Sequence, residues 1–138
     1  MKSILLSIVL AILLTACKKQ NTSGETLNEQ VNPNATALVK GSFSGAGGHS
    51  VSGSAEIVND NNVKRLVLKN FSSTAGPDLK VYLSTTQQAG TFISLGTLKS
   101  TSGMQVYDIS GMPDLAQYKY VLIWCQQFSV LFGSAELK

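Results

Sequence analysis

The stretch Ser54–Lys69, which reads SAEIVNDNNVKRLVLK, decides the fold class of this chain. Apolar side chains recur with a period of two in residues 54–57 and again in residues 65–69. This alternation is typical of strands that bury one face. Between the two runs, Asp60-Asn61-Asn62 supplies residues that tolerate the left-handed backbone of a tight turn. The stretch therefore predicts a β-hairpin.

Short apolar runs separated by Gly, Asn, Asp and Ser occupy most of the chain on either side of this hairpin. With the hairpin they predict eight strands, at about Leu38–Phe43, Ser50–Val58, Val63–Asn70, Leu79–Ser84, Ile93–Lys99, Gln105–Ile109, Tyr118–Gln126 and Ser129–Leu137. Residues 120–125 are apolar on both faces, so we expect neighbours on both sides of that strand. Residues 114–117 could form a single helical turn. The pattern predicts an all-β fold, either an antiparallel β-sandwich or a closed barrel.

The composition excludes several classes of protein. The chain has 138 residues and a formal net charge of +3, from 11 Lys plus Arg and 8 Asp plus Glu. This length is too short for a multidomain enzyme. The basic residues form no stripe, so we expect no nucleic-acid partner. Neither a nucleotide-binding loop nor a nucleophile elbow occurs at residues 41–50, so independent enzyme activity has little support.

The amino-terminal residues resemble an export signal. Lys2 precedes an apolar stretch from Ile4 to Leu14, which is too short to span a membrane but fits the core of a signal peptide. It ends in Leu14-Thr15-Ala16-Cys17, which resembles the bacterial lipoprotein processing box. We therefore expect residues 1–16 to be a lipoprotein signal peptide and Cys17 to carry acyl chains such as palmitate. The alternative is an ordinary signal peptide with an incidental cysteine.

Residues 17–36 predict the lipidated cysteine and a flexible tether. Leu27 and Val31 are the only large apolar side chains in residues 18–36, too few to offset the entropy of ordering. As a coil, the tether would hold a domain of residues 37–138 roughly 25 Å from its anchor. We expect an extracytoplasmic location in the cell envelope. Lys18 in place of an aspartate favours the outer membrane of a two-membrane bacterium.

Several blocks of the chain form a pattern in a fixed order: Gly41-Ser42-Phe43, His49 with Ser52-Gly53, residues 66–71, residues 76–83, residues 103–107, and residues 121–128 with Phe132 and Ala135. Together these blocks resemble the electron-transfer DM-thirteen domain family, and the similarity covers nearly all of residues 37–138. The resemblance implies redox chemistry at a late cysteine, either as a bare thiol or as the ligand of a group such as haem. Cys125 matches that cysteine, and His49 matches an early histidine of the family. It also implies a redox partner protein.

The residues themselves leave two interpretations of Cys125 open. It is the only thiol left once Cys17 is lipidated, so it is either a small buried hydrophobe or a reactive group. His49 is either a solvated loop histidine or, with Cys125, an axial ligand of haem. The first functional hypothesis is a membrane-anchored electron-transfer domain centred on Cys125. The alternative is a non-catalytic cell-surface binding or scaffolding module in which Cys125 packs the core.

Other candidates for a site have equally good structural explanations. Trp124 and Tyr107 could wall a cofactor pocket, although core packing explains both side chains. Met104 and Met112 could be soft ligands, or they could simply pack. A blue-copper site normally needs two histidines, and the chain has a single one. We therefore expect neither blue copper nor structural zinc.

Overall fold

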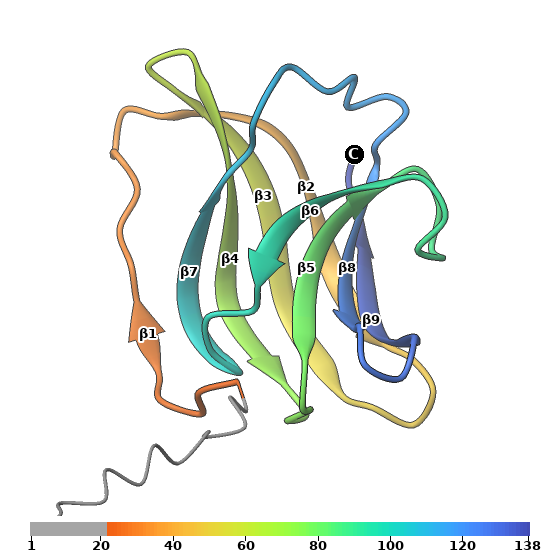
Figure 1. The fold of residues 1–138 in the computed structure, drawn as a ribbon. Coiled ribbons are helices and arrows are strands. Elements are labelled where there is room, and N and C mark those ends of the chain that lie inside the picture. The colour runs from red at the N-terminus through yellow and green to blue at the C-terminus, as the bar shows by residue number, and fades with distance from the viewer. Residues whose placement is uncertain (1–21) are drawn as a thin grey trace, which may run out of the picture.

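The computed structural model describes residues 22–138, and these residues form strands and loops without a helix (Figure 1). The all-β prediction is confirmed. The strands of this part of the chain are β1 (Leu27–Asn28), β2 (Thr36–Gly45), β3 (Val51–Asp60), β4 (Val63–Ser73), β5 (Leu79–Ser84), β6 (Phe92–Thr97), β7 (Ser102–Asp108), β8 (Tyr120–Cys125) and β9 (Val130–Glu136). They make one sheet in the order β1-β7-β4-β3-β2-β9-β8-β5-β6.

The predicted hairpin is formed by β3 and β4. Asp60 pairs with Val63 across the turn, and Asn61 and Asn62 have φ angles of 51° and 66°. Positive φ at both central residues defines the turn whose twist matches that of two antiparallel strands. The side chains of Ile57 and Leu66 are fully buried, as the alternation predicts.

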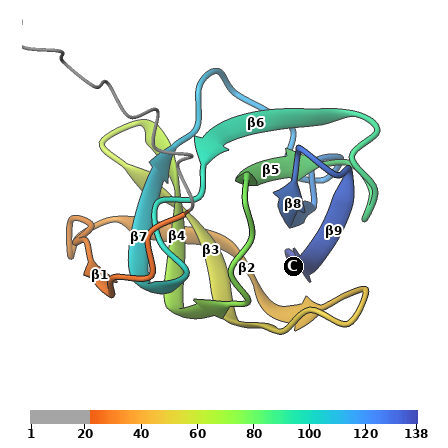
Figure 2. The same cartoon turned by 60° about the horizontal axis from the view of Figure 1, so that its bottom comes forward.

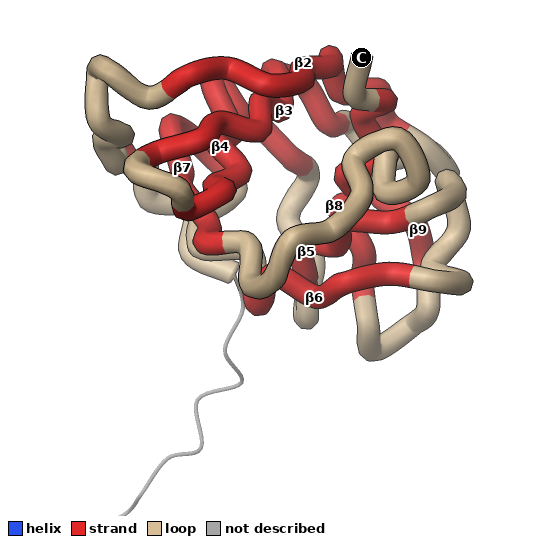
Figure 3. Tube along the Cα trace, turned by 90° about the horizontal axis from the view of Figure 1, so that it is seen from above, coloured by secondary structure: helices blue, strands red, loops and turns tan. Residues whose placement is uncertain are grey.

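The sheet of the described residues is open and mixed and has nine strands where eight were predicted, so the predicted sandwich or closed barrel is not confirmed. Figures 2 and 3 show it curling around its interior as a half-barrel, and its edge strands β1 and β6 do not pair with each other. β1 pairs with β7 in parallel, while the other pairings are antiparallel. The sheet stays continuous because β2 pairs with β3 along Thr36–Ser42 and with β9 along Phe43–Gly45.

The concave side of the sheet holds the core. β8 lies between β9 and β5, as its two apolar faces predict. Its residues Val121, Ile123 and Cys125 point into a cluster that also contains Phe43, Phe71 and Phe132. Residues 114–117 form a hydrogen-bonded turn in which the Gln117 N–H donates to the Asp114 carbonyl (3.0 Å). The single helical turn suggested there is not a helix in the structure.

Residues 22–36, which the composition predicts to be part of a flexible tether, lie along the β7 side of the domain (Figure 1). The Glu29 N–H donates to the Met104 carbonyl (3.0 Å), and the Thr101 N–H donates to the Ser23 carbonyl (2.9 Å). The Val106 N–H donates to the Glu29 carboxylate (2.7 Å). Not one side chain before β2 is fully buried in the described part of this segment, so polar contacts hold it. The predicted signal peptide and Cys17 lie outside the described residues.

Four connections and the first described residues meet at one end of the half-barrel, which we call the lower end (bottom of Figure 1). The connections are residues 46–50, 74–78, 98–101 and 126–129. Hydrogen bonds link them in series: the Ser73 N–H donates to the Thr101 carbonyl (2.9 Å) and the Thr74 N–H to the Ser50 carbonyl (2.8 Å). Within residues 22–138 there is no helix of the length and apolar character that crossing a bilayer requires.

Candidate functional site

Cys125 is the last residue of β8 and lies at the lower end of the core. It pairs with Leu79 of β5 and Val130 of β9, so β8 has a neighbouring strand on each side at this residue. The residue is 1% exposed, and it is the free cysteine of the described part of the chain. It is therefore a core residue by packing, as one of the two sequence interpretations requires.

His49 lies in the connection between β2 and β3, where two glycines turn the chain. Gly47 and Gly48 have φ angles of 60° and 82°, a conformation that costs glycine little because it has no Cβ. The His49 N–H donates to the Ala46 carbonyl (3.0 Å), and the Ala46 N–H donates to the carbonyl of Phe132 on β9 (2.8 Å). These bonds fix the loop against β9.

The imidazole of His49 stacks on the ring of Phe132. The two ring centroids are 3.7 Å apart, and the planes meet at 6°. Phe132 is itself almost fully buried, so one face of the imidazole is covered while the residue as a whole is half-buried. His49 is therefore held in one orientation, unlike a freely solvated loop histidine.

His49 and Cys125 line the same pocket. Its volume is about 350 Å³, and its walls come from three of the lower-end connections and from β8 and β9: His49, Ala75, Gly76, Pro77, Cys125, Phe128, Val130 and Phe132. Except for the imidazole and the thiol, the lining side chains are apolar. The structure thus brings together the two residues that the sequence singles out.

Sequence reasoning did not identify the rest of the pocket wall. Gly76 leaves room for the Phe132 ring, because a Cβ at Gly76 would lie 2.8 Å from Phe132 Cζ. The Gly-Pro-Asp turn is visible in the sequence, but the loop it packs against is not. Phe128 lines the pocket from the turn after β8, and this residue is 63% exposed.

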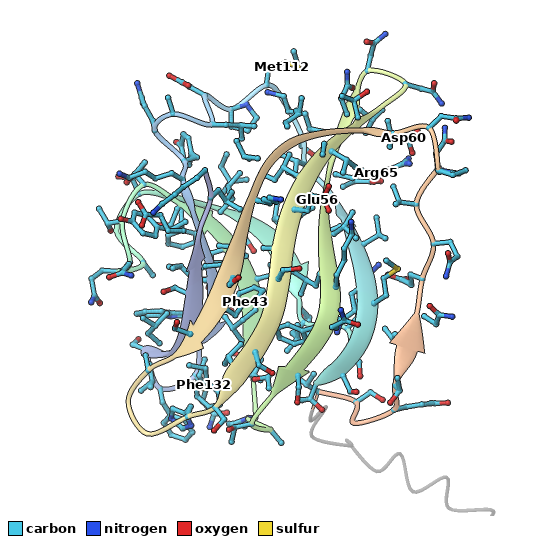
Figure 4. The ribbon with its side chains drawn as sticks, turned by 180° about the vertical axis from the view of Figure 1, so that it is seen from behind. Phe43, Glu56, Asp60, Arg65, Met112 and Phe132 are labelled. Atoms are coloured by element: carbon cyan, nitrogen blue, oxygen red, sulfur yellow. The ribbon has the colours of Figure 1, made fainter. Side chains whose placement is uncertain are left out.

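The aromatic and sulfur candidates other than Cys125 lie elsewhere. Trp124 points away from the core and is near Tyr82, with ring centroids 6.5 Å apart. Tyr107 is buried and donates to Gln105 Oε1 (2.7 Å); burial is the main cause that raises its pKa. Met112 is 80% exposed at the end of the domain opposite Phe132 (Figure 4). Met104 lines a separate groove beside β1.

A larger groove of about 460 Å³ lies between β7 and Glu29, and its charged side chains pair with one another. Lys99 contacts the Glu29 carboxylate (2.9 Å), and Arg65 contacts Asp60 and Asp108. Burial acts to raise the pKa of Glu29, but hydrogen bonds from Lys99 and Val106 outweigh it and hold the pKa below 4.5. With its charges already paired, this groove is less suited to a ligand than the His49–Cys125 pocket.

Haem does not fit the pocket as folded. Its volume is near the lower limit of small-ligand pockets, which span about 300–1,000 Å³, whereas haem is a large macrocycle with two carboxylates. No lysine or arginine of the described chain lines the pocket to pair with those carboxylates. Among residues 22–138, no group of three His, Cys, Asp or Glu side chains could hold a metal ion.

Fold and pocket define a small all-β domain that places a thiol and an imidazole on the wall of one apolar pocket. The chain belongs to the family Electron transfer DM13, which it matches over residues 42–137. The match runs from within β2 to the end of β9 and includes both His49 and Cys125. Membership indicates an electron-transfer role and is consistent with a redox partner. Comparison with curated proteins and with solved structures finds no match.

Proposed function

We propose that this chain is a membrane-anchored, extracytoplasmic electron-transfer domain whose redox site is the His49–Cys125 pocket. In this proposal a small redox-active molecule occupies the pocket, in contact with the thiol of Cys125. The observation that carries the proposal is the shared pocket: two chemically active side chains from distant parts of the sequence line the same apolar cavity. Family membership supplies the electron-transfer class.

The burial of Cys125 favours a bound molecule over direct thiol exchange with a partner protein. Disulfide exchange requires a thiolate to approach a sulfur in line, and access controls its rate. At 1% exposure, Cys125 offers no such approach from a protein surface. A molecule small enough to enter the pocket reaches the wall that the sulfur forms.

His49 supplies the polar contact in this arrangement. A neutral imidazole has one N–H donor and one acceptor nitrogen, so it can orient a bound carbonyl or hydroxyl group. Stacking on Phe132 fixes the plane of the ring.

The test is to purify the full chain after native export and to analyse the molecules released on denaturation. We expect a redox-active compound that the Cys125→Ser and His49→Ala variants lose and that the exposed-site control Met112→Ser retains. A Soret band that depends on Cys125 would contradict the pocket assignment made above. The electron-transfer proposal is refuted if purified protein, titrated with reductant and oxidant, shows no reversible signal that Cys125→Ser alters.

Anchoring through Cys17 is part of the same proposal. Its support is the apolar stretch that ends in Leu14-Thr15-Ala16-Cys17. Mass spectrometry of the mature amino-terminal peptide should find acyl groups on Cys17, and Cys17→Ser should release the protein from membranes. Membrane fractionation tests the outer-membrane location that Lys18 favours. An unmodified Cys17 would refute the anchor but not the redox site.

A binding or scaffolding module is the second candidate, and the close packing of Cys125 in the core favours it. In that case Cys125→Ala changes stability alone and leaves partner capture intact. Loss of a redox signal in Cys125→Ala protein that is still folded would decide against it.

A further inference from the structure

The His49–Cys125 pocket and the point where the chain enters the domain lie at the same end of the half-barrel. Ser23 is hydrogen-bonded to Thr101, and Thr101 to Ser73, the last residue of β4 before the connection that carries Ala75–Pro77 of the pocket wall. In Figure 1 the first described residues and the β8–β9 turn are both at the bottom. Figure 4 shows Met112 and Phe132 at opposite ends of the domain.

The contacts of residues 22–36 leave little chain between this end and the proposed anchor. Lys18–Asn21 are the four residues between Cys17 and the described part of the chain. Even fully extended, the step from Cys17 to Thr22 spans at most about 18 Å. β3, with 10 residues, is roughly 30 Å long, so the opposite end lies that much farther from the anchor. An anchored domain therefore presents its lower end to the bilayer.

The chemistry at the pocket suits a membrane surface. Phe128 is 63% exposed beside the pocket, and its ring can insert at the boundary between lipid headgroups and acyl chains, where phenylalanine side chains bind favourably. None of the lining side chains is a lysine, arginine, aspartate or glutamate. A ligand with phosphate or carboxylate groups would leave its charges unpaired there, so the pocket selects a neutral molecule.

The interior of the pocket suits a flat ring with carbonyl groups. The parallel rings of His49 and Phe132 both line it, and aromatic side chains favour offset stacking with planar systems. The imidazole can donate a hydrogen bond to a carbonyl oxygen. The volume of about 350 Å³ accommodates a ring system and leaves an alkyl tail to extend past Phe128 into lipid.

We infer that the redox-active occupant is a lipid-soluble quinone, which enters the His49–Cys125 pocket from the bilayer past Phe128. This inference rests on the proposed function, because it names the class of molecule that the electron-transfer site takes. The membrane supplies the quinone, and the docking of residues 22–36 holds the pocket within its reach.

The test uses the full lipidated chain in phosphatidylethanolamine–phosphatidylglycerol vesicles that contain an alkyl naphthoquinone. Both positions of its quinone double bond carry substituents, so the Cys125 thiol has no free ring carbon to add to. Trp124 is the only tryptophan of the chain and adjoins Cys125, so quenching of its fluorescence reports binding. We expect saturable quenching. Ala75→Phe, which adds a ring at the pocket wall, should weaken apparent affinity at least tenfold.

Two controls distinguish binding in the pocket from entry through the bilayer. Ala116→Phe adds the same ring at an exposed position on the connection before β8 and should leave the affinity unchanged. The non-lipidated Cys17→Ser chain should need a higher protein concentration for the same quenching, because it is not held at the bilayer. Equal affinity with and without the lipid would overturn the entry from the membrane.

The outcomes also distinguish this inference from the proposed function. Non-saturable quenching, or equal quenching in native protein and Ala75→Phe, refutes the quinone assignment. The electron-transfer proposal then still stands if a Cys125-dependent redox signal persists with another molecule. Saturable binding without any Cys125-dependent signal supports the quinone site and refutes the redox role of Cys125.

Discussion

The Gly103→Ala substitution should detach residues 22–36 from the domain. Gly103 pairs with Leu27 across the β1–β7 contact and has a φ of 101°. A Cβ at this position would lie 1.9 Å from the Leu27 carbonyl oxygen and 2.7 Å from the Leu27 nitrogen. Both clashing atoms belong to the backbone, so no side-chain rotation relieves the overlap and β1 must move away.

The free-energy cost of detachment follows from the hydrogen bonds that hold residues 22–36 to the domain. Detachment breaks the hydrogen bonds of Ser23, Glu29 and Val106 described above, each worth about 0.5–1.5 kcal/mol. Their sum is about 1.5–4.5 kcal/mol, which corresponds to an increase of about tenfold or more in the population of the open state. The positive φ of an alanine should cost about 1–2 kcal/mol. The core should lose little more, because the segment before β2 buries no side chain fully.

Hydrogen exchange followed by mass spectrometry measures both effects. Amides of residues 22–36 should exchange much faster in Gly103→Ala, while those of the β3–β4 hairpin keep most of their protection. Gly90→Ala is the matched control, because a Cβ at Gly90 has no heavy atom within 4 Å. Unchanged protection of residues 22–36 in Gly103→Ala would refute the reasoning. In the proposed lipid-anchored protein, we expect this release to lengthen the tether to an average reach of roughly 25 Å and to weaken the inferred capture of quinone.

Three further predictions concern the site and the Glu29 contacts. Cys125→Ser should lower the free energy of unfolding, measured in denaturant titrations, by about 1–3 kcal/mol, because it buries a hydroxyl group without a hydrogen-bond partner. Equal stability of the two proteins would show that water reaches this side chain. His49→Ala should lower the free energy of unfolding by about 0.5–1.5 kcal/mol and should speed the labelling of Cys125 by a thiol reagent several-fold. An unchanged labelling rate would mean that the imidazole stacked on Phe132 does not block access to the sulfur. The lowered pKa of Glu29 means that its stabilising contribution is present above pH 4.5 and is lost as the pH falls through the folded-state pKa. Proteolysis of residues 22–36 should therefore rise at acidic pH in the native protein, and Glu29→Gln, already weakened at neutral pH, should show less of this dependence.

The sequence determined the local elements, because their signals are local. The two-residue alternation placed the hairpin partners β3 and β4, and the two asparagines at its turn have the positive φ angles that their side chains tolerate. The prediction for Leu79–Ser84 agrees with β5 residue for residue. Predicted boundaries elsewhere differ by a few residues, since pairing partners rather than propensity decide where a strand ends.

The sequence did not predict β1, and the reason is physical. Leu27–Asn28 has no periodicity and buries no side chain fully. It becomes a strand because β7 offers an open edge and Gly103 leaves space for its backbone. The composition of residues 22–36 correctly reports the lack of a core-facing side, but it carries no information about a docking edge built by other strands.

The sequence identified the reactive residue types of the candidate site, but it did not predict that these residues lie in one pocket. A cysteine without an expected disulfide partner and a histidine after a glycine-rich stretch are visible as residue types, so Cys125 and His49 could be chosen before any fold was known. That they share a pocket depends on the pairing of β2 with β9, which brings the His49 loop against Phe132 beside the end of β8. Long-range strand pairing is set by the summed burial of the whole sheet, and so only the tertiary structure decides which side chains meet.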